Sequence, residues 1–176
     1  MGELWPFGYC TAITAAFVAL AHLWPCQRSV DRHIDRSFSD FASFWPLYVS
    51  QHRAPLTKLL HAVSTSAISL VVMTRYKPVI ALRFGLGLIS GISLSLCTVD
   101  WTASFPNGLP EALLMVFFII ACVRQMAGLG TTHVARLLAA GYLLPWAAHF
   151  FIERNRPATF LHPTFSLLGD FKLLGL

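Results

Sequence analysis

Five long apolar runs constrain this chain of 176 residues more than any other feature of its sequence. They cover residues 7–25, 59–74, 78–97, 109–125 and 134–152. Each run is close to the length of roughly 20 residues that crosses the hydrocarbon core of a bilayer. Only 12% of the residues are charged, whereas a soluble domain carries about 25%. Because so few charges cannot cover a soluble surface, the sequence predicts a single all-α membrane domain over residues 1–176, with about four to five transmembrane helices.

The first run predicts an uncleaved N-terminal anchor helix over residues 7–25. A secretory signal begins with positive charge, but the residues before this run contain Glu3 and no Lys or Arg. Arg28, Arg32 and Arg36 follow the run, so the positive-inside rule places its end in the cytosol. With five spans, eight of the 13 Lys and Arg residues lie inside and five outside. This bias is weak, and the same topology makes residues 153–176 a cytosolic segment.

An aromatic stripe follows the anchor. Phe38, Phe41, Trp45 and Tyr48 are spaced so that their side chains share one face of a helix, which predicts a helix over residues 38–51. Trp and Tyr favour the headgroup level of a membrane, so this helix can lie in the interface. The alternative, of equal weight, is that the stripe packs on the core of the bundle.

Several classes of protein find no support in the sequence. The net charge of +5 comes from dispersed basic residues, not from the basic patch that is typical of nucleic-acid binding. The GxSxG, P-loop and HExxH motifs are absent, and the four cysteines include no CxxC pair. Gly85, Gly87 and Gly91 predict a small-residue face for close helix packing. A dinucleotide loop is disfavoured there because no strand precedes them.

Two histidines bracket a predicted corner of the chain. His52 and His61 lie on either side of Pro55. In one continuous helix, nine residues would turn the two side chains 180° apart. With a break at Pro55, His52 ends the first helix and His61 lies one turn inside the next span. Both imidazoles can then point into one space.

A second pair lies at the end of the last span. His149 and Glu153 are four residues apart, so they share one face of a helix. Imidazole and carboxylate can ligate a metal, although such a pair is also common as a helix hydrogen bond. Four spans separate His61 from His149, and an even number returns the chain to the same side of the bilayer. The three imidazoles and the carboxylate are therefore expected to converge at one membrane face.

This set of residues favours a metal site. Histidine and carboxylate ligands with open positions suit non-haem Fe²⁺, the usual ion for O₂ chemistry, and zinc is the less favoured alternative. Around one ion, paired nitrogens approach to roughly 3–4 Å, whereas a separation of more than about 10 Å excludes a shared ion. His22, His33 and His162 are expected to lie outside this shell.

Four polar residues near the predicted site have candidate supporting roles. Arg154 and Arg156 can hold the carboxylate or phosphate of a head group, although membrane anchoring needs only their charge. Asn155 and Asp170 can accept hydrogen bonds from ligating imidazoles. Capping or turn formation is the simpler interpretation of both.

Three blocks of the sequence resemble those of a known membrane protein family. They are FWPLYVSQHRAPLTKLLH (44–61), GYLLPWAAHFFIERNRPATF (141–160) and SLLGDF (166–171). The characterised fungal member of this family is a 2-hydroxy fatty acid dioxygenase of the endoplasmic reticulum, which acts in phytosphingosine breakdown. The RNRPATF form of the second block belongs to a less studied branch. The family usually has Gly where this chain has Ser64.

The resemblance implies a helical membrane protein of the endoplasmic reticulum that uses Fe²⁺ and O₂. The implied reaction is α-oxidation, in which a 2-hydroxy fatty acid loses one carbon. The family's histidines match His52, His61 and His149, its acidic position matches Glu153, and its Arg-Pro pair matches residues 156–157. His162 has no match and inherits no role.

Two further hypotheses accompany the enzyme. The first is a non-enzymatic membrane protein that binds lipids or organises a complex, in which the His and Glu residues form a hydrogen-bonded polar core. The second is a transporter, which is weak because neither inverted repeats nor a chain of charged residues at mid-membrane is apparent. Metal content distinguishes the enzyme from the first of these hypotheses.

Overall fold

The computed structural model describes residue 38 and residues 40–175, so the predicted anchor at 7–25 lies outside the described residues. The regular elements of the described part are all helical, as the apolar runs predicted. In chain order they are α2 (Phe41–Ser50), α3 (Pro55–Arg75), α4 (Pro78–Leu96), α5 (Val99–Thr102), α6 (Leu109–Ala127), α7 (Thr131–Ala148), a π-helical turn (His149–Glu153), a 3₁₀ turn (Ala158–Phe160) and α8 (Pro163–Leu173).

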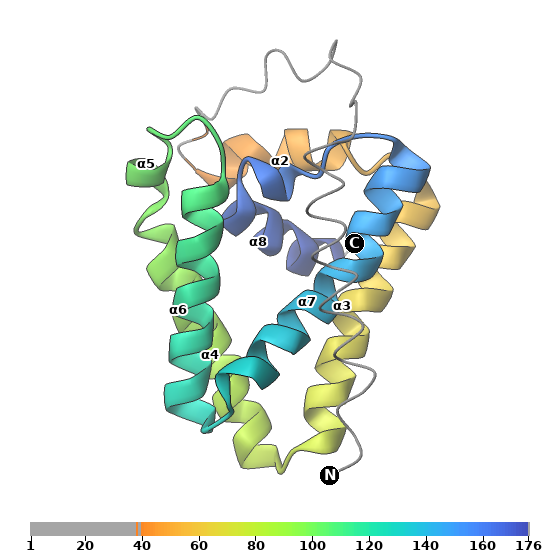
Figure 1. The fold of residues 1–176 in the computed structure, drawn as a ribbon. Coiled ribbons are helices and arrows are strands. Elements are labelled where there is room, and N and C mark those ends of the chain that lie inside the picture. The colour runs from red at the N-terminus through yellow and green to blue at the C-terminus, as the bar shows by residue number, and fades with distance from the viewer. Residues whose placement is uncertain (1–37, 39, 176) are drawn as a thin grey trace.

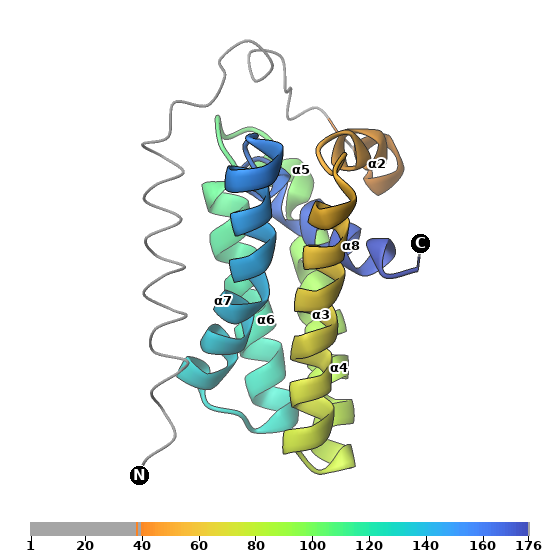
Figure 2. The same ribbon diagram turned by 90° about the vertical axis from the view of Figure 1, so that its right-hand side faces the viewer.

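Four helices in this part of the chain are long and apolar enough to cross a membrane: α3, α4, α6, and α7 together with the π turn. They run lengthwise through the molecule (Figures 1 and 2). The apolar run at 59–74 has 16 residues, but α3 begins four residues earlier, at Pro55, and has 21 residues. At 1.5 Å per residue it is about 30 Å long, which matches the hydrocarbon core. A proline at the first or second position starts α3, α4, α6 and α8, where its missing N–H costs no hydrogen bond.

Helices α4 and α6 lie side by side along most of their length (Figure 1). A Cβ added to Gly87 would lie 2.7 Å from the Cα of Val123, and one added to Gly91 would lie 2.5 Å from the Cα of Ile119. These two glycines therefore allow the close backbone contact that the sequence predicted. Gly85 does not belong to that face, because a Cβ there would meet no atom within 4 Å.

A polar contact joins α3 to α7. Pro145 lies inside α7 and has no N–H to donate to the carbonyl of Gly141, one turn earlier. The buried hydroxyl of Ser64 donates to that carbonyl instead, at 2.6 Å. Ser64 thus satisfies a backbone acceptor that the proline leaves open.

Helix α2 crosses one end of the bundle, with α8 beneath it (Figure 1). Asp40 caps α2 through a 2.8 Å bond from the N–H of Ser43, so the helix begins three residues later than predicted. Phe44 and Tyr48 are fully buried and pack in one cluster with Phe165. The aromatic stripe therefore contributes to the core, as the second alternative proposed, although Phe41 and Trp45 remain half-buried.

The C-terminal segment folds back onto the bundle. Helix α8 contacts α2, α3, α4 and α6, and most of its residues are buried. The carboxylate of Glu111, which is fully buried in α6, accepts the N–H of Thr164 in the first turn of α8 at 3.0 Å. Negative charge is stabilising at the N-terminus of a helix. Glu111 therefore helps to fix the helix that carries Asp170.

Candidate metal centre

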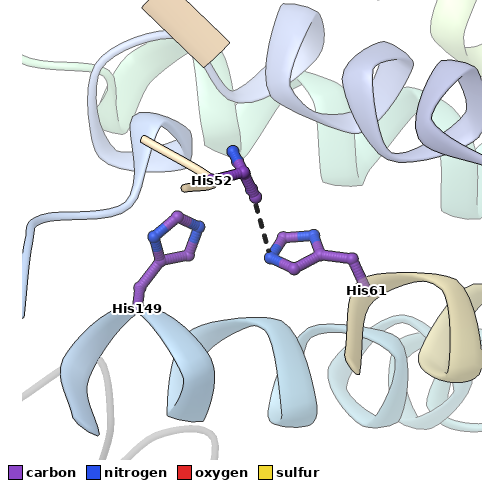
Figure 3. A group of neighbouring side chains, drawn as sticks. All are labelled: His52, His61 and His149. Atoms are coloured by element: carbon purple, nitrogen blue, oxygen red, sulfur yellow. Dashed lines mark hydrogen bonds between the residues drawn. The ribbon is translucent and has the colours of Figure 1, made fainter. Parts of the chain in front are cut away.

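Three histidines meet at the end of the bundle that α2 covers. His52 lies just after α2, His61 lies in the second turn of α3, and His149 opens the π turn that follows α7. Their ring centroids are 4.4 Å (52 to 61), 4.7 Å (52 to 149) and 5.3 Å (61 to 149) apart. All three side chains are buried, and Figure 3 shows the rings gathered around one space.

The Nδ1 atom of each ring faces a hydrogen-bond acceptor. For His52 the acceptor is the backbone carbonyl of Tyr48, at 2.6 Å. For His61 it is a carboxylate oxygen of Asp170, at 2.9 Å. For His149 it is the side-chain oxygen of Asn155, at 2.7 Å. Each acceptor requires a proton on Nδ1, so in the neutral ring each Nε2 carries only a lone pair.

The Nε2 lone pairs face one another. The Nε2 atoms of His52 and His61 are 3.2 Å apart, and neither has a proton to share when the Nδ1 bonds are made. Among the described residues, one ligand atom from each of the three histidines lies within 4.8 Å of the others. Two buried nitrogen lone pairs that face each other at 3.2 Å repel unless a cation or a proton lies between them. The donor set therefore fits a metal ion.

Neutral imidazole is favoured at His52. Burial, and then the neighbouring His61, lower the pKa of His52 to about 4. Burial has this effect because it disfavours the charged form of the ring. At neutral pH the ring is therefore in the form that can bind a metal without first releasing a proton.

Asp170 links the site to α8. The same carboxylate oxygen accepts the proton of His61 Nδ1 and the hydroxyl of Tyr48, the latter at 2.6 Å. Burial and the Asp170 charge raise the pKa of Tyr48 well above its ordinary value, so the hydroxyl stays protonated and donates. A Cβ on Gly169 would lie 2.5 Å from the Tyr48 ring. In the third sequence block, Gly169 thus allows α8 to lie close to the Tyr48 ring. The neighbouring Asp170 is the acceptor for His61 and Tyr48.

Asn155 links the site to the loop after α2. Its side-chain NH₂ donates to the carbonyl of Gln51 at 3.0 Å, which turns its oxygen toward His149. The π turn makes this possible, because the carbonyl of His149 accepts the N–H of Arg154, five residues later, and also that of Asn155. Arg154 has φ of 53°, a left-handed conformation that costs a residue other than glycine about 1–2 kcal/mol. Such π turns are frequent at functional sites.

The three charged residues that follow His149 differ in their contacts and in their exposure to solvent. Glu153 lies outside the group of three possible ligands, and its Oε1 accepts the N–H of Ala54 at the start of α3, at 2.8 Å. Its charge still raises the pKa of His52 slightly against the larger opposing effects. Arg154 is exposed. Arg156 is half-buried, with its guanidinium 5.7 Å from the Phe160 ring centroid.

The remaining histidines lie elsewhere or outside the described residues. His162 is buried at the start of α8, against the rings of Phe38 and Phe44. His133 contacts the Tyr76 hydroxyl, near the opposite end of the bundle. His22 and His33 are not among the described residues.

Several partners in the site were not predicted from the sequence. The carbonyls of Tyr48 and Gln51 are main-chain groups, so no side-chain motif points to them. The Tyr48 hydroxyl had one usable signal, since Tyr48 precedes His52 by four residues and therefore lies on the same helical face. The aromatic stripe was interpreted only as a packing or interfacial feature.

The comparisons with known proteins agree with this geometry. No curated protein and no solved structure matches the chain. One family model does match, over residues 38–176, and its description is "2-hydroxy-palmitic acid dioxygenase Mpo1-like". The match covers all three histidines and most of the chain. The chain therefore belongs to the Mpo1-like family.

Proposed function

We propose that this protein is an Fe²⁺-dependent dioxygenase that shortens 2-hydroxy fatty acids by one carbon. The observation that carries the proposal is the convergence of three buried imidazoles, each with Nδ1 held by an acceptor and Nε2 left as a lone pair. The family description supplies the substrate class and the use of O₂. The four helices that are long and apolar enough to cross a membrane support a membrane location for the site, where long-chain acids are concentrated.

Iron is the metal that we propose for this site. Imidazole nitrogen suits iron, zinc, copper and nickel, so the donor set alone leaves several ions open. Zinc has no redox chemistry, whereas a dioxygenase must pass electrons to O₂. Bound Fe²⁺ would supply the activation of O₂, with His52, His61 and His149 as its protein ligands.

The proposed reaction balances with O₂ as the only co-substrate: R–CH(OH)–COOH + O₂ → R–COOH + CO₂ + H₂O. The bond between the carboxyl carbon and the hydroxyl-bearing carbon breaks. The hydroxyl-bearing carbon is oxidised to the new carboxyl group, the old carboxyl carbon leaves as CO₂, and O₂ takes up four electrons. No further reductant is required.

The surrounding residues have proposed roles that follow from their contacts. Asp170 and Asn155 hold two of the imidazoles in the tautomer that exposes Nε2, and such partners orient metal ligands. We propose that Arg154 or Arg156 binds the substrate carboxylate, because both lie directly after the π turn. Glu153 is proposed as an acidic catalytic group at the end of the π turn, where its Oε1 accepts the N–H of Ala54 at the start of α3.

The proposed location is the endoplasmic reticulum membrane, with the site at the cytosolic face. The family resemblance supports the organelle, and the basic residues at 28, 32 and 36 support the orientation. Residues 153–176 then lie on the cytosolic side, with α8 folded against the bundle end. Protease protection in microsomes, with a tag after residue 176, tests this orientation.

Iron content and product analysis test the function together. The purified protein is expected to contain iron and to convert 2-hydroxypalmitate into the acid one carbon shorter under air. His61→Ala is expected to lose both properties, because it removes one of three ligands. His133→Ala is the matched control, since that histidine lies near the other end of the bundle. Iron-free wild-type protein, or full activity in His61→Ala, contradicts the proposal and favours a lipid-binding or scaffolding role.

A further inference from the structure

A large apolar cavity lies between α3, α4, α7 and α8, beside the metal centre. Its volume is about 630 Å³, within the range of roughly 300–1,000 Å³ that is typical of small-molecule sites. Ile68 and Val72 line it from α3, Phe84 from α4, Leu137 from α7 and Leu167 from α8. An apolar space of this size, inside a membrane protein, fits a hydrocarbon chain.

One end of the cavity lies next to a residue that holds a candidate metal ligand, although the three histidines themselves are not among the lining residues. Asp170 lines the cavity, and the same carboxylate binds His61 Nδ1. At the other end, the lining includes Met73 and Pro78, near the turn between α3 and α4. The lining residues of α3 run from Thr65 to Met73, over which the helix advances about 12 Å along its axis. The cavity therefore begins at a residue that holds a candidate metal ligand and extends along about 12 Å of α3 toward its C-terminal end.

Tyr142 places an unpaired donor among the residues that line the cavity. Its hydroxyl is buried and has no hydrogen-bond partner, and the residue lines the cavity. The ring itself packs against Trp146, with centroids 5.6 Å apart. A buried hydroxyl without a partner is costly, so a ligand oxygen at this point would stabilise the site.

The cavity opens laterally between α3 and α4. Three of its lining residues are also largely exposed: Met73 (71%), Leu82 (64%) and Ile89 (62%). Both helices are candidate membrane spans, so these side chains face lipid. A chain can therefore pass from the bilayer into the cavity without crossing water.

We propose that this cavity binds the acyl chain of the substrate, which enters between α3 and α4, and that the Tyr142 hydroxyl donates a hydrogen bond to an oxygen of its polar head. The inference rests on the proposed function for the identity of the head group. The occupant is a single-chain amphiphile, because most of the lining residues are apolar and the one charged lining residue, Asp170, lies at the end next to His61. The head group then lies at the end nearest His61.

Substitution of Gly85 by a large side chain can fill the cavity selectively. It lines the cavity, and a side chain there would meet no atom within 4 Å at its Cβ. Gly85→Phe is therefore expected to occupy acyl-chain space without disturbing the packing of α4 on α6. Ser69→Phe fills the cavity from α3 as a second variant, and Leu113→Phe, at an exposed position outside the lining, is the matched control.

Photolabelling tests the acyl site without turnover. The probe is 2-hydroxypalmitate with a diazirine near its tail, added to the purified wild-type protein and to each variant in nanodiscs without O₂. We expect labelled peptides from α3 and α4 in the wild type and in Leu113→Phe, and loss of this labelling in Gly85→Phe and Ser69→Phe. Undiminished labelling in both filled variants, or labelling confined to other helices, overturns the proposal.

The Tyr142 contact needs its own comparison. Tyr142→Phe keeps the ring and removes only the hydroxyl, so we expect it to weaken 2-hydroxypalmitate binding about tenfold. Labelling by an alkyl diazirine without a carboxyl or hydroxyl group should not change. Equal affinity of the wild type and Tyr142→Phe for the acid overturns the role of the hydroxyl.

These experiments distinguish failure of the proposed acyl site from failure of the proposed dioxygenase function. Specific labelling of α3 and α4 in protein that lacks iron and activity supports the acyl site and contradicts the dioxygenase. Iron-dependent activity with no effect of either filled variant supports the dioxygenase and overturns the acyl site.

Discussion

The two helix pairs of this bundle are held together by different physical means. The α4–α6 pair is apolar and depends on close backbone contact at Gly87 and Gly91. The α3–α7 pair depends on polar contacts, including the hydrogen bond between Ser64 and Gly141, and it carries two of the three candidate metal ligands. The difference indicates that α4–α6 mainly supports the fold, while α3–α7 mainly supports the chemistry.

Gly91→Leu is expected to have the largest effect on the fold. The Cβ would lie 2.5 Å from the Cα of Ile119, and backbone atoms cannot yield as a flexible side chain can. The helices must separate, and overpacking of this kind costs about 3 kcal/mol or more. Unfolding by sodium dodecyl sulfate, followed by circular dichroism, measures the loss.

Gly85→Leu is the matched control for that substitution. It introduces the same side chain on the same helix, where a Cβ meets nothing within 4 Å, so a change of no more than about 0.5 kcal/mol is expected. Equal destabilisation by the two substitutions would contradict the view that α4 has one packed and one open face.

Asp170→Asn is expected to produce the opposite result, a damaged site in an intact fold. The substitution keeps the shape of the side chain but removes the charge that His61 and Tyr48 share. Loss of such a partner typically weakens metal affinity 10- to 100-fold. Titration with a competing chelator measures this change, while the unfolding midpoint should move much less than in Gly91→Leu.

Asp100→Asn controls for the loss of a carboxylate elsewhere. Asp100 is exposed in the short helix α5, so the iron affinity should equal that of the wild type. If Asp170→Asn binds iron as the wild type does, Asp170 serves packing alone.

Much of the fold could be predicted because it follows from the lengths of the apolar runs. Four runs correspond to helices that are able to span a membrane, and an even number of spans between His61 and His149 is sufficient to return the chain to one face. Pro55 indicated the corner that brings His52 toward His61. Each of these inferences uses only local sequence and the thickness of a bilayer.

The details of the site depended on backbone geometry that a sequence does not display. The π turn at His149 and the left-handed conformation of Arg154 bring Asn155 back to the imidazole. The i, i+4 pattern of His149 and Glu153 could not reveal that the carboxylate meets the N–H of Ala54. Likewise, the spacing of the glycines in α4 did not separate Gly85, which faces the cavity, from the two that contact α6.

Ser64→Ala is expected to have the smallest effect, and it tests why the α3–α7 pair needs a polar contact. The hydroxyl donates to the Gly141 carbonyl, which Pro145 leaves without its usual helical partner. Removing the hydroxyl should destabilise the protein by about 1 kcal/mol, since buried hydrogen bonds between membrane helices contribute modestly. Ser66→Ala, at an exposed position in the same helix, should leave the unfolding midpoint unchanged.

A double-mutant cycle with Pro145→Ala decides the cause. Alanine at position 145 restores an N–H that can donate to the Gly141 carbonyl within α7. In the Pro145→Ala protein, the Gly141 carbonyl no longer requires the Ser64 hydroxyl as its donor. Ser64→Ala should therefore lower the free energy of unfolding clearly less in that protein than in the wild type. Strictly additive effects would mean that Ser64 acts through its volume, and the polar character of the α3–α7 pair would then rest on the metal centre and the contact between Glu153 and Ala54.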